Sequence, residues 1–209
     1  GEAKDGQLVV AVIIVSPDRG RPPIGKVLVV LGDQLTASKV VEMAIHGHNL
    51  PHEFNDAVLR EANAIPVDVQ NSEIQGRVDL RQMPLVTIDG EDAKDFDDAV
   101  YCETNSKGFR LVVAIADVSH YVQPGSALDD EAQLRGTSVY FPGFVVPMLP
   151  ERISIDLCSL KEGEDRPALA CHITINAEGH KRSHHFTRAV IRVAAGLAYE
   201  QAQAIVDGR

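Results

Sequence analysis

The chain has no tryptophan, and aromatic residues make up only 5% of its 209 positions. A surface that stacks nucleic-acid bases would therefore depend on a few tyrosines and phenylalanines. The sequence also has no apolar run of about 18 residues, the length that a membrane-spanning helix requires. Its first residues, GEAKDG, lack the charged and apolar regions of a signal peptide. We therefore expect no membrane span and a cytoplasmic location.

Cysteine and basic residues are also scarce. The three cysteines, Cys102, Cys158 and Cys171, form no CxxC pair, and none of the eight histidines belongs to an HExxH motif. We therefore expect reduced, buried thiols and no zinc site. Lys and Arg number 20 against 30 Asp and Glu, a formal net charge of −10. This balance argues against coating nucleic acid by charge alone, but not against a nuclease whose metal ions neutralise the local field.

The pattern of apolar residues predicts an α+β fold, with an antiparallel or mixed sheet and flanking helices. An apolar fraction of 44% and a charged fraction of 24% are typical of a globular protein with a core. The first part of the chain is expected to hold two strands, two helices and a polar connection. These are, in order, 7–15, 25–32, a helix capped by Thr36 or Ser38, a helix at 55–64, and the connection at 65–83.

The second part, from about Pro84 onward, is expected to carry most of the sheet. Three strands, a helix and a hairpin turning at Glu178-Gly179 are predicted, and a last helix covers about 195–206. The segment PGFVVPMLPER is too interrupted by Pro and Gly for a regular element. The earlier helix opens with Ser126 and Asp129 in capping-box spacing. The three strands are expected at 83–89, 98–103 and 109–118, and the hairpin arms at 168–180 and 184–193.

Between these predicted strands, residues 89–98 contain six carboxylates and one lysine. Four of them stand at the spacing D-x5-D-x-D-D: Asp89, Asp95, Asp97 and Asp98. Carboxylates this close repel one another unless a cation lies among them. Oxygen ligands of this kind suit Mg²⁺ or Mn²⁺ better than zinc. The cluster therefore predicts a divalent-metal site that could act on a phosphodiester.

The local geometry sets a condition on this site. In an extended DFDD segment Asp95 and Asp97 would lie on one face and Asp98 on the other, so all four converge only if the segment is a loop or bulge. Two alternatives stay open: an acidic loop in solvent, and a calcium loop. The second departs from the EF-hand pattern, because Val100 stands where its glycine should be.

Several motifs together give the chain a family resemblance. TIDGEDAKDFDDAVY, LVVAIADVSHYV, LDDEAQLRGTSVYFPGFVVPMLPERIS and LCSL resemble the catalytic RNB domain of the RNase II and RNase R family. Residues 84–209 would be the N-terminal half of that domain. Residues 1–45 resemble the end of a cold-shock-type barrel of the OB class, and 46–83 would be connecting helices and linker. We therefore expect a fragment of a longer protein, inactive or weak by itself.

The resemblance implies a hydrolytic 3′→5′ exoribonuclease that degrades single-stranded RNA processively to nucleoside 5′-monophosphates. It implies Mg²⁺ or Mn²⁺ as the metal, no haem or nucleotide cofactor, and a monomer. An aromatic residue would stack on the RNA, and an arginine could touch phosphate, although a surface salt bridge is the alternative for the arginine. The residues so assigned are Asp89, Asp95, Asp97 and Asp98 for catalysis and metal, and Tyr140 and Arg135 for RNA.

The sequence departs from the family wording near its end. Val193, Gly196 and Ala198 replace a Ser, a basic residue and a Thr, which removes polar and cationic contacts to RNA there. A competing function is a non-catalytic RNA-binding module with a structural metal in the acidic loop. Retention of all four aspartates favours the enzyme.

Overall fold

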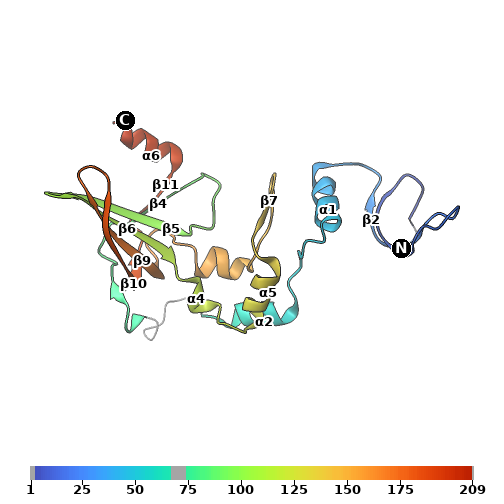
Figure 1. The fold of residues 1–209 in the computed structure, drawn as a ribbon, viewed down its shortest axis with the longest axis horizontal. Helices are drawn as coiled ribbons and strands as arrows, with labels where there is room; N and C mark the ends of the chain where they lie inside the picture. Colours follow the sequence, from blue (N-terminus) through green and yellow to red (C-terminus); the bar gives the residue numbers. More distant parts are fainter. Residues whose placement is uncertain (1–2, 67–73, 209) are drawn as a thin grey trace. The chain divides into compact units, whose positions relative to one another are not determined.

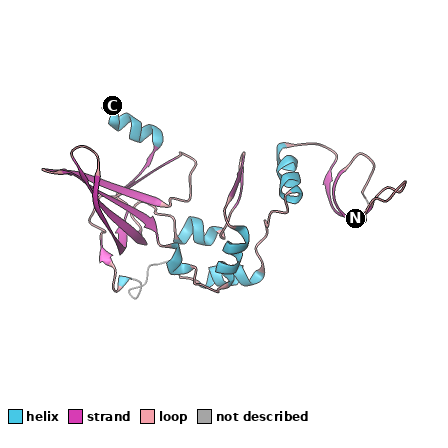
Figure 2. Ribbon diagram, viewed as in Figure 1, coloured by secondary structure: helices cyan, strands magenta, loops and turns pink. Residues whose placement is uncertain are grey.

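The computed structural model describes residues 3–66 and 74–208, which fall into two compact units. Unit 1 comprises residues 1–54 and 134–148, and unit 2 comprises residues 55–133 and 149–209. Figure 1 traces both along the chain, and Figure 2 distinguishes their helices and strands. No helix among the described residues is both long enough and apolar enough to cross a membrane.

Unit 1 is built on two short antiparallel hairpins and a helix. Strands β1 (Leu8–Val15) and β2 (Ile24–Gly32) form the first hairpin, and β7 (Val139–Phe141) and β8 (Phe144–Val146) form the second. Helix α1 (Ala37–Gly47) begins after Thr36, whose side chain accepts a hydrogen bond from the Lys39 amide at 3.4 Å. The predicted strands and the Thr36 cap are confirmed, and the sheet here is a two-stranded piece of the kind expected of a partial barrel.

Unit 2 is a single seven-stranded mixed sheet with the order β11-β4-β5-β6-β9-β10-β3. The two outermost pairs, β11 with β4 and β10 with β3, are parallel, and the others are antiparallel. The strands are β3 (Val78–Asp79), β4 (Val86–Asp89), β5 (Asp98–Asn105), β6 (Gly108–Ala116), β9 (Asp165–Asn176), β10 (Lys181–Arg192) and β11 (Ala195–Ala198). The expected α+β architecture is therefore observed.

The core of unit 2 lies against this sheet and among the helices next to it. Alternate residues of β6, Val112 and Ala114, are fully buried beside Ala170 of β9. The helices contribute buried residues such as Val58 and Leu128. The helices with buried residues are α2 (Asp56–Ala64), α4 (Val118–Tyr121), α5 (Ala127–Arg135, whose last two residues belong to unit 1) and the π-helix η1 (Arg152–Leu157). The last helix, α6 (Tyr199–Val206), has no buried residue.

Three local predictions were wrong. The last helix begins at Tyr199, because Ala195–Ala198 pair with β4 as strand β11. The segment PGFVVPMLPER is not irregular throughout: it supplies β8 and leads into η1. The connection at 65–83 contains the short strand β3, while its residues 67–73 lie outside the described residues. For β11 and β3 a pairing with a distant part of the chain decided the local structure, whereas β8 pairs with the neighbouring β7.

Two smaller expectations are partly met. Ser126 caps α5 by accepting from the Asp129 amide at 3.2 Å, but the Asp129 carboxylate accepts from the Gly125 amide at 2.9 Å, so the reciprocal bond of a capping box is not the one formed. The three cysteines are free thiols, yet Cys158 alone is buried and Cys102 is exposed.

Candidate active site

The four motif aspartates lie at the point where two neighbouring strands of unit 2 meet. Asp89 is the last residue of β4, and Asp98 is the first residue of β5. These strands pair antiparallel, with Val86 opposite Val100, and residues 90–97 connect them as a loop. Asp95 and Asp97 lie in this loop, which we call the aspartate loop. The expectation that the DFDD segment leaves regular strand geometry before Asp98 is thus met.

The backbone of the aspartate loop is held by hydrogen bonds to segments distant in sequence. The Ser159 hydroxyl accepts from the Phe96 amide at 3.1 Å and donates to the Lys94 carbonyl at 2.8 Å. The Leu160 amide donates to the Phe96 carbonyl at 2.8 Å, and the Ala116 amide donates to the Asp97 carbonyl at 2.9 Å. The positions of Asp95 and Asp97 are therefore fixed by β6 and by the segment after η1.

Two of the four aspartates, Asp89 and Asp97, have a raised pKa. Loss of hydrating water raises the pKa of Asp97, and the charges of Asp95, Asp98 and Asp89 raise it further. The pKa of Asp89 is raised in the same way, first by lost hydration and then by Asp98 and Asp95. No ion pair in the described part of the chain joins any of the four to a Lys or Arg. The loop thus concentrates negative charge, and Lys94 is the one basic residue in its sequence.

This donor set fits a hard divalent cation in charge and chemistry. Within residues 3–66 and 74–208, however, no three Asp, Glu, His or Cys side chains are gathered closely enough to hold an ion. Binding of an ion would therefore have to bring the carboxylates closer together. The backbone that carries Asp95 and Asp97 is held by the hydrogen bonds described above.

A cavity of about 360 Å³ adjoins the aspartate loop. Gly90, Glu91 and Phe96 of the loop line one part of it, and residues of β11 and α6 line the rest: Gly196, Leu197, Ala198, Glu200 and Gln201. Two of the positions at which the sequence departs from the family pattern, Gly196 and Ala198, thus line this cavity. Small side chains there leave open space beside the loop.

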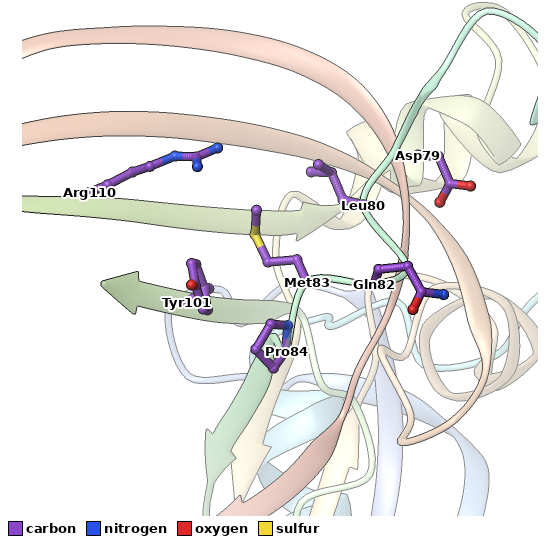
Figure 3. Close-up of a pocket in the computed structure, with 7 residues that line it drawn as sticks. All are labelled: Asp79, Leu80, Gln82, Met83, Pro84, Tyr101 and Arg110. Atoms are coloured by element: carbon purple, nitrogen blue, oxygen red, sulfur yellow. The ribbon is translucent and has the colours of Figure 1, made fainter. Parts of the chain in front are cut away.

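A second pocket of about 310 Å³ lies elsewhere in unit 2 (Figure 3). Its lining includes Met83, Tyr101 and Arg110, and none of the four aspartates. The Tyr101 hydroxyl and the Arg110 guanidinium both bond to the Glu103 carboxylate, at 2.9 and 3.2 Å. Two of its polar groups are therefore already bonded to a neighbouring carboxylate.

The two predicted RNA contacts lie in unit 1. Tyr140 is on β7 with 69% of its surface exposed, so its ring is available for stacking. The Arg135 guanidinium donates to the Pro147 and Glu53 carbonyls, at 3.1 and 2.9 Å, and lies 3.8 Å over the Phe54 ring. Arg135 therefore has a structural task in this unit, and its contact with phosphate stays a prediction.

Two arginines of unit 2 with buried side chains could not be identified from the sequence. Arg77 pairs with Asp117 at 2.7 Å, with side chains only 6% and 4% exposed. Asp117 precedes α4, accepts a hydrogen bond from Ser119 and also forms this pair. Arg166 donates to the Ser159 carbonyl at 3.0 Å from inside unit 2. Neither pairing has a signal in local spacing, because the partners come from different elements.

Comparisons with known proteins agree with this architecture. Residues 77–209 match the RNB domain model, and residues 1–55 match the cold shock domain model. Ribonuclease R of Vibrio parahaemolyticus is 47% identical over 207 residues, which cover 99% of this chain and 25% of that protein. The chain thus spans about a quarter of the length of this relative.

Solved structures show the same fold. Mycoplasma genitalium RNase R in complex with ribose-methylated single-stranded RNA matches with a TM-score of 0.91 and 31% identity, over 97% of this chain and 32% of that one. Yeast Ssd1, described as a pseudonuclease, matches with a TM-score of 0.76 at 20% identity, over 97% of this chain and 26% of that one; this likeness concerns the fold alone. With the RNB model covering 77–209 and the aspartate motif in place, the chain belongs to the RNB domain family.

Proposed function

We propose that this protein is a hydrolytic 3′→5′ exoribonuclease that degrades single-stranded RNA processively to nucleoside 5′-monophosphates with Mg²⁺ or Mn²⁺. The observation that carries the proposal is the aspartate loop. All four motif carboxylates are retained in an RNB-family chain, at the meeting point of β4 and β5, on a backbone pinned from two sides. The proposed division is a barrel part at 1–45, a connection at 46–83 and the catalytic part at 84–209.

The proposed roles follow from the positions of the residues. Asp89 and Asp98, at the strand ends, would be direct metal ligands, and Asp95 and Asp97 would complete the site from the loop. The bound ion supplies Lewis-acid polarisation of the phosphodiester. The protein's own contribution is to carry four negative charges on one anchored loop and the strand ends beside it, which favours a divalent ion over a monovalent ion. Tyr140 would stack on a base, a contact that tolerates any sequence.

The test is degradation of 5′-labelled single-stranded RNA by the full-length gene product, with Mg²⁺ or with EDTA. We expect a ladder of shortening products with Mg²⁺ only, and its loss in Asp97→Asn. Asp92→Asn is the matched control, because Asp92 is an exposed carboxylate of the same loop outside the motif. Nucleoside monophosphates as the released product, identified by chromatography, would establish the reaction. Equal loss in both variants would mean that loop charge as such, and not the motif, matters.

A non-catalytic RNA-binding module is the second candidate. It is favoured by one observation: the fold is shared with a protein described as a pseudonuclease, so the fold by itself does not imply cleavage. RNA binding without degradation by the wild-type protein, unchanged by Mg²⁺ or by Asp97→Asn, would establish this reading and overturn the first.

A further inference from the structure

Ser159 holds the aspartate loop with both hydrogen-bonding functions of one hydroxyl. The residue is fully buried, and its hydroxyl accepts from the Phe96 amide and donates to the Lys94 carbonyl. These two backbone groups flank Asp95 on either side. One side chain, more than sixty positions away in sequence, therefore spans the segment that carries Asp95 and leads into Asp97.

Further bonds extend this contact in both directions. Next to Ser159, the Leu160 amide donates to the Phe96 carbonyl, so two successive residues bond to the loop. Behind Ser159, the buried Arg166 donates to its carbonyl at 3.0 Å and to the Asp156 carbonyl at 2.9 Å, and pairs with Glu164. A guanidinium satisfies several carbonyls at once with fixed geometry, so Arg166 makes the Ser159 segment stiff.

We propose that Ser159 is a positioning residue for the divalent-cation site, with Arg166 holding Ser159 in place. The proposal rests on the function proposed above, and it names a part of the site outside the carboxylate motif. Neither Ser159 nor Arg166 would touch metal or RNA. Their effect would reach the ion through the loop backbone and the carboxylates of Asp95 and Asp97.

The physical reason is that the four carboxylates repel one another before an ion binds. A free loop would relieve this repulsion by moving Asp95 and Asp97 away from Asp89 and Asp98, and binding would then have to reorder the loop. The Ser159 bonds oppose that motion. Without the Ser159 hydroxyl, the Phe96 amide and the Lys94 carbonyl lose this hydrogen-bond partner. Because unpaired polar groups are costly when buried, the loop would then favour a different conformation.

The test measures Mn²⁺ affinity and loop protection in the same variants. Mn²⁺ binding is titrated by electron paramagnetic resonance, and exchange of the Phe96 amide is followed by NMR. For Ser159→Ala we expect Mn²⁺ binding about 10-fold weaker, as for loss of other groups that support metal ligands, together with faster Phe96 exchange. Ser159→Thr, which keeps the hydroxyl, should restore both. Arg166→Lys, which leaves the Ser159 side chain intact, should give a smaller loss.

Ser154→Ala is the matched control, because its hydroxyl lies in the nearby η1 and donates to the local Pro150 carbonyl, at 3.4 Å. Its Mn²⁺ affinity should equal that of wild type. Unfolding curves show which variants retain a cooperative fold; if Ser159→Ala does not, Arg166→Lys carries the test. Faster Phe96 exchange with unchanged Mn²⁺ affinity would overturn the positioning role. Wild type that binds no Mn²⁺ would instead overturn the proposed metal site itself, and with it any role for Ser159 there.

Discussion

The buried pair of Arg77 and Asp117 offers a sharp test of what holds unit 2 together. Asp117→Asn keeps the size of the side chain but leaves the Arg77 charge buried, since the two side chains are 6% and 4% exposed. Breaking a buried pair on one side costs about 3–5 kcal/mol. At about 3 °C per kcal/mol for a chain of this size, the expected fall in Tm is roughly 9–15 °C.

The assay is thermal and urea unfolding followed by circular dichroism. The control is Asp79→Asn, which breaks the more exposed pair with Arg81 at 2.6 Å and should shift the transition far less. Arg77→Met combined with Asp117→Asn should recover part of the loss, because the uncompensated buried charge is then gone. A shift for Asp117→Asn no larger than that for Asp79→Asn would refute the reasoning.

The same pair has a pH signature. Burial by itself would raise the pKa of Asp117, but hydrogen bonds from Arg77 and Ser119 and the Arg77 charge hold it below its ordinary value of 3.8. A carboxyl with a lowered pKa in the folded state contributes stability above pH 3.8, and that contribution is lost as the pH falls through the lowered value. The difference between wild type and Asp117→Asn should therefore shrink only below about pH 3.8.

Two further predictions concern the site. In metal-free protein, Asp97→Asn should raise Tm near neutral pH. Lost hydration and neighbouring carboxylates raise the Asp97 pKa, so the stability of the wild type falls as the pH rises through that pKa. Thermal scans from acid to neutral pH should therefore show a smaller change of Tm with pH for the variant than for the wild type. A lower Tm for the variant at neutral pH would contradict this. Tyr140→Ala should leave Tm nearly unchanged, because the side chain is 69% exposed, and weaken single-stranded RNA binding by about 10-fold if one base stacks on it. Fluorescence anisotropy on the full-length gene product measures this, and unchanged affinity would remove Tyr140 from the RNA surface.

The sequence predicted those parts of the fold that local patterns determine. The β1–β2 hairpin, the Thr36 cap and the β9–β10 hairpin all follow from alternation, turn residues or capping chemistry within a short window. Strands β3 and β11 were missed for the opposite reason. Each is short, and each is defined by a parallel partner far along the chain, Ala189 for Val78 and Val86 for Ala195. Nothing in their own residues distinguishes them from connection or helix.

The same division holds for the site. The four aspartates could be found because they are adjacent in sequence and crowd charge in a way that demands an explanation. Ser159 and Arg166 could not, since a serine in LCSL and an arginine before a strand are ordinary residues until the fold brings them to the loop. The motif LCSL is part of the family resemblance, but a sequence motif alone does not say which residues Ser159 contacts.

Under the proposed function, active and inactive proteins with this fold would differ at the aspartate loop and its anchors, not in the sheet. The seven-stranded sheet supplies the meeting point of β4 and β5, and a protein described as a pseudonuclease has a similar fold, so the sheet alone cannot determine catalysis. What the sheet does not supply is resistance of the aspartate loop to the repulsion among its carboxylates. Here that resistance comes from bonds of Ser159, Leu160 and Ala116 to the loop backbone. We therefore expect two separable ways to lose activity. Removing a carboxylate of the aspartate loop should stabilise the metal-free fold, whereas removing a hydrogen bond that anchors the loop should destabilise it.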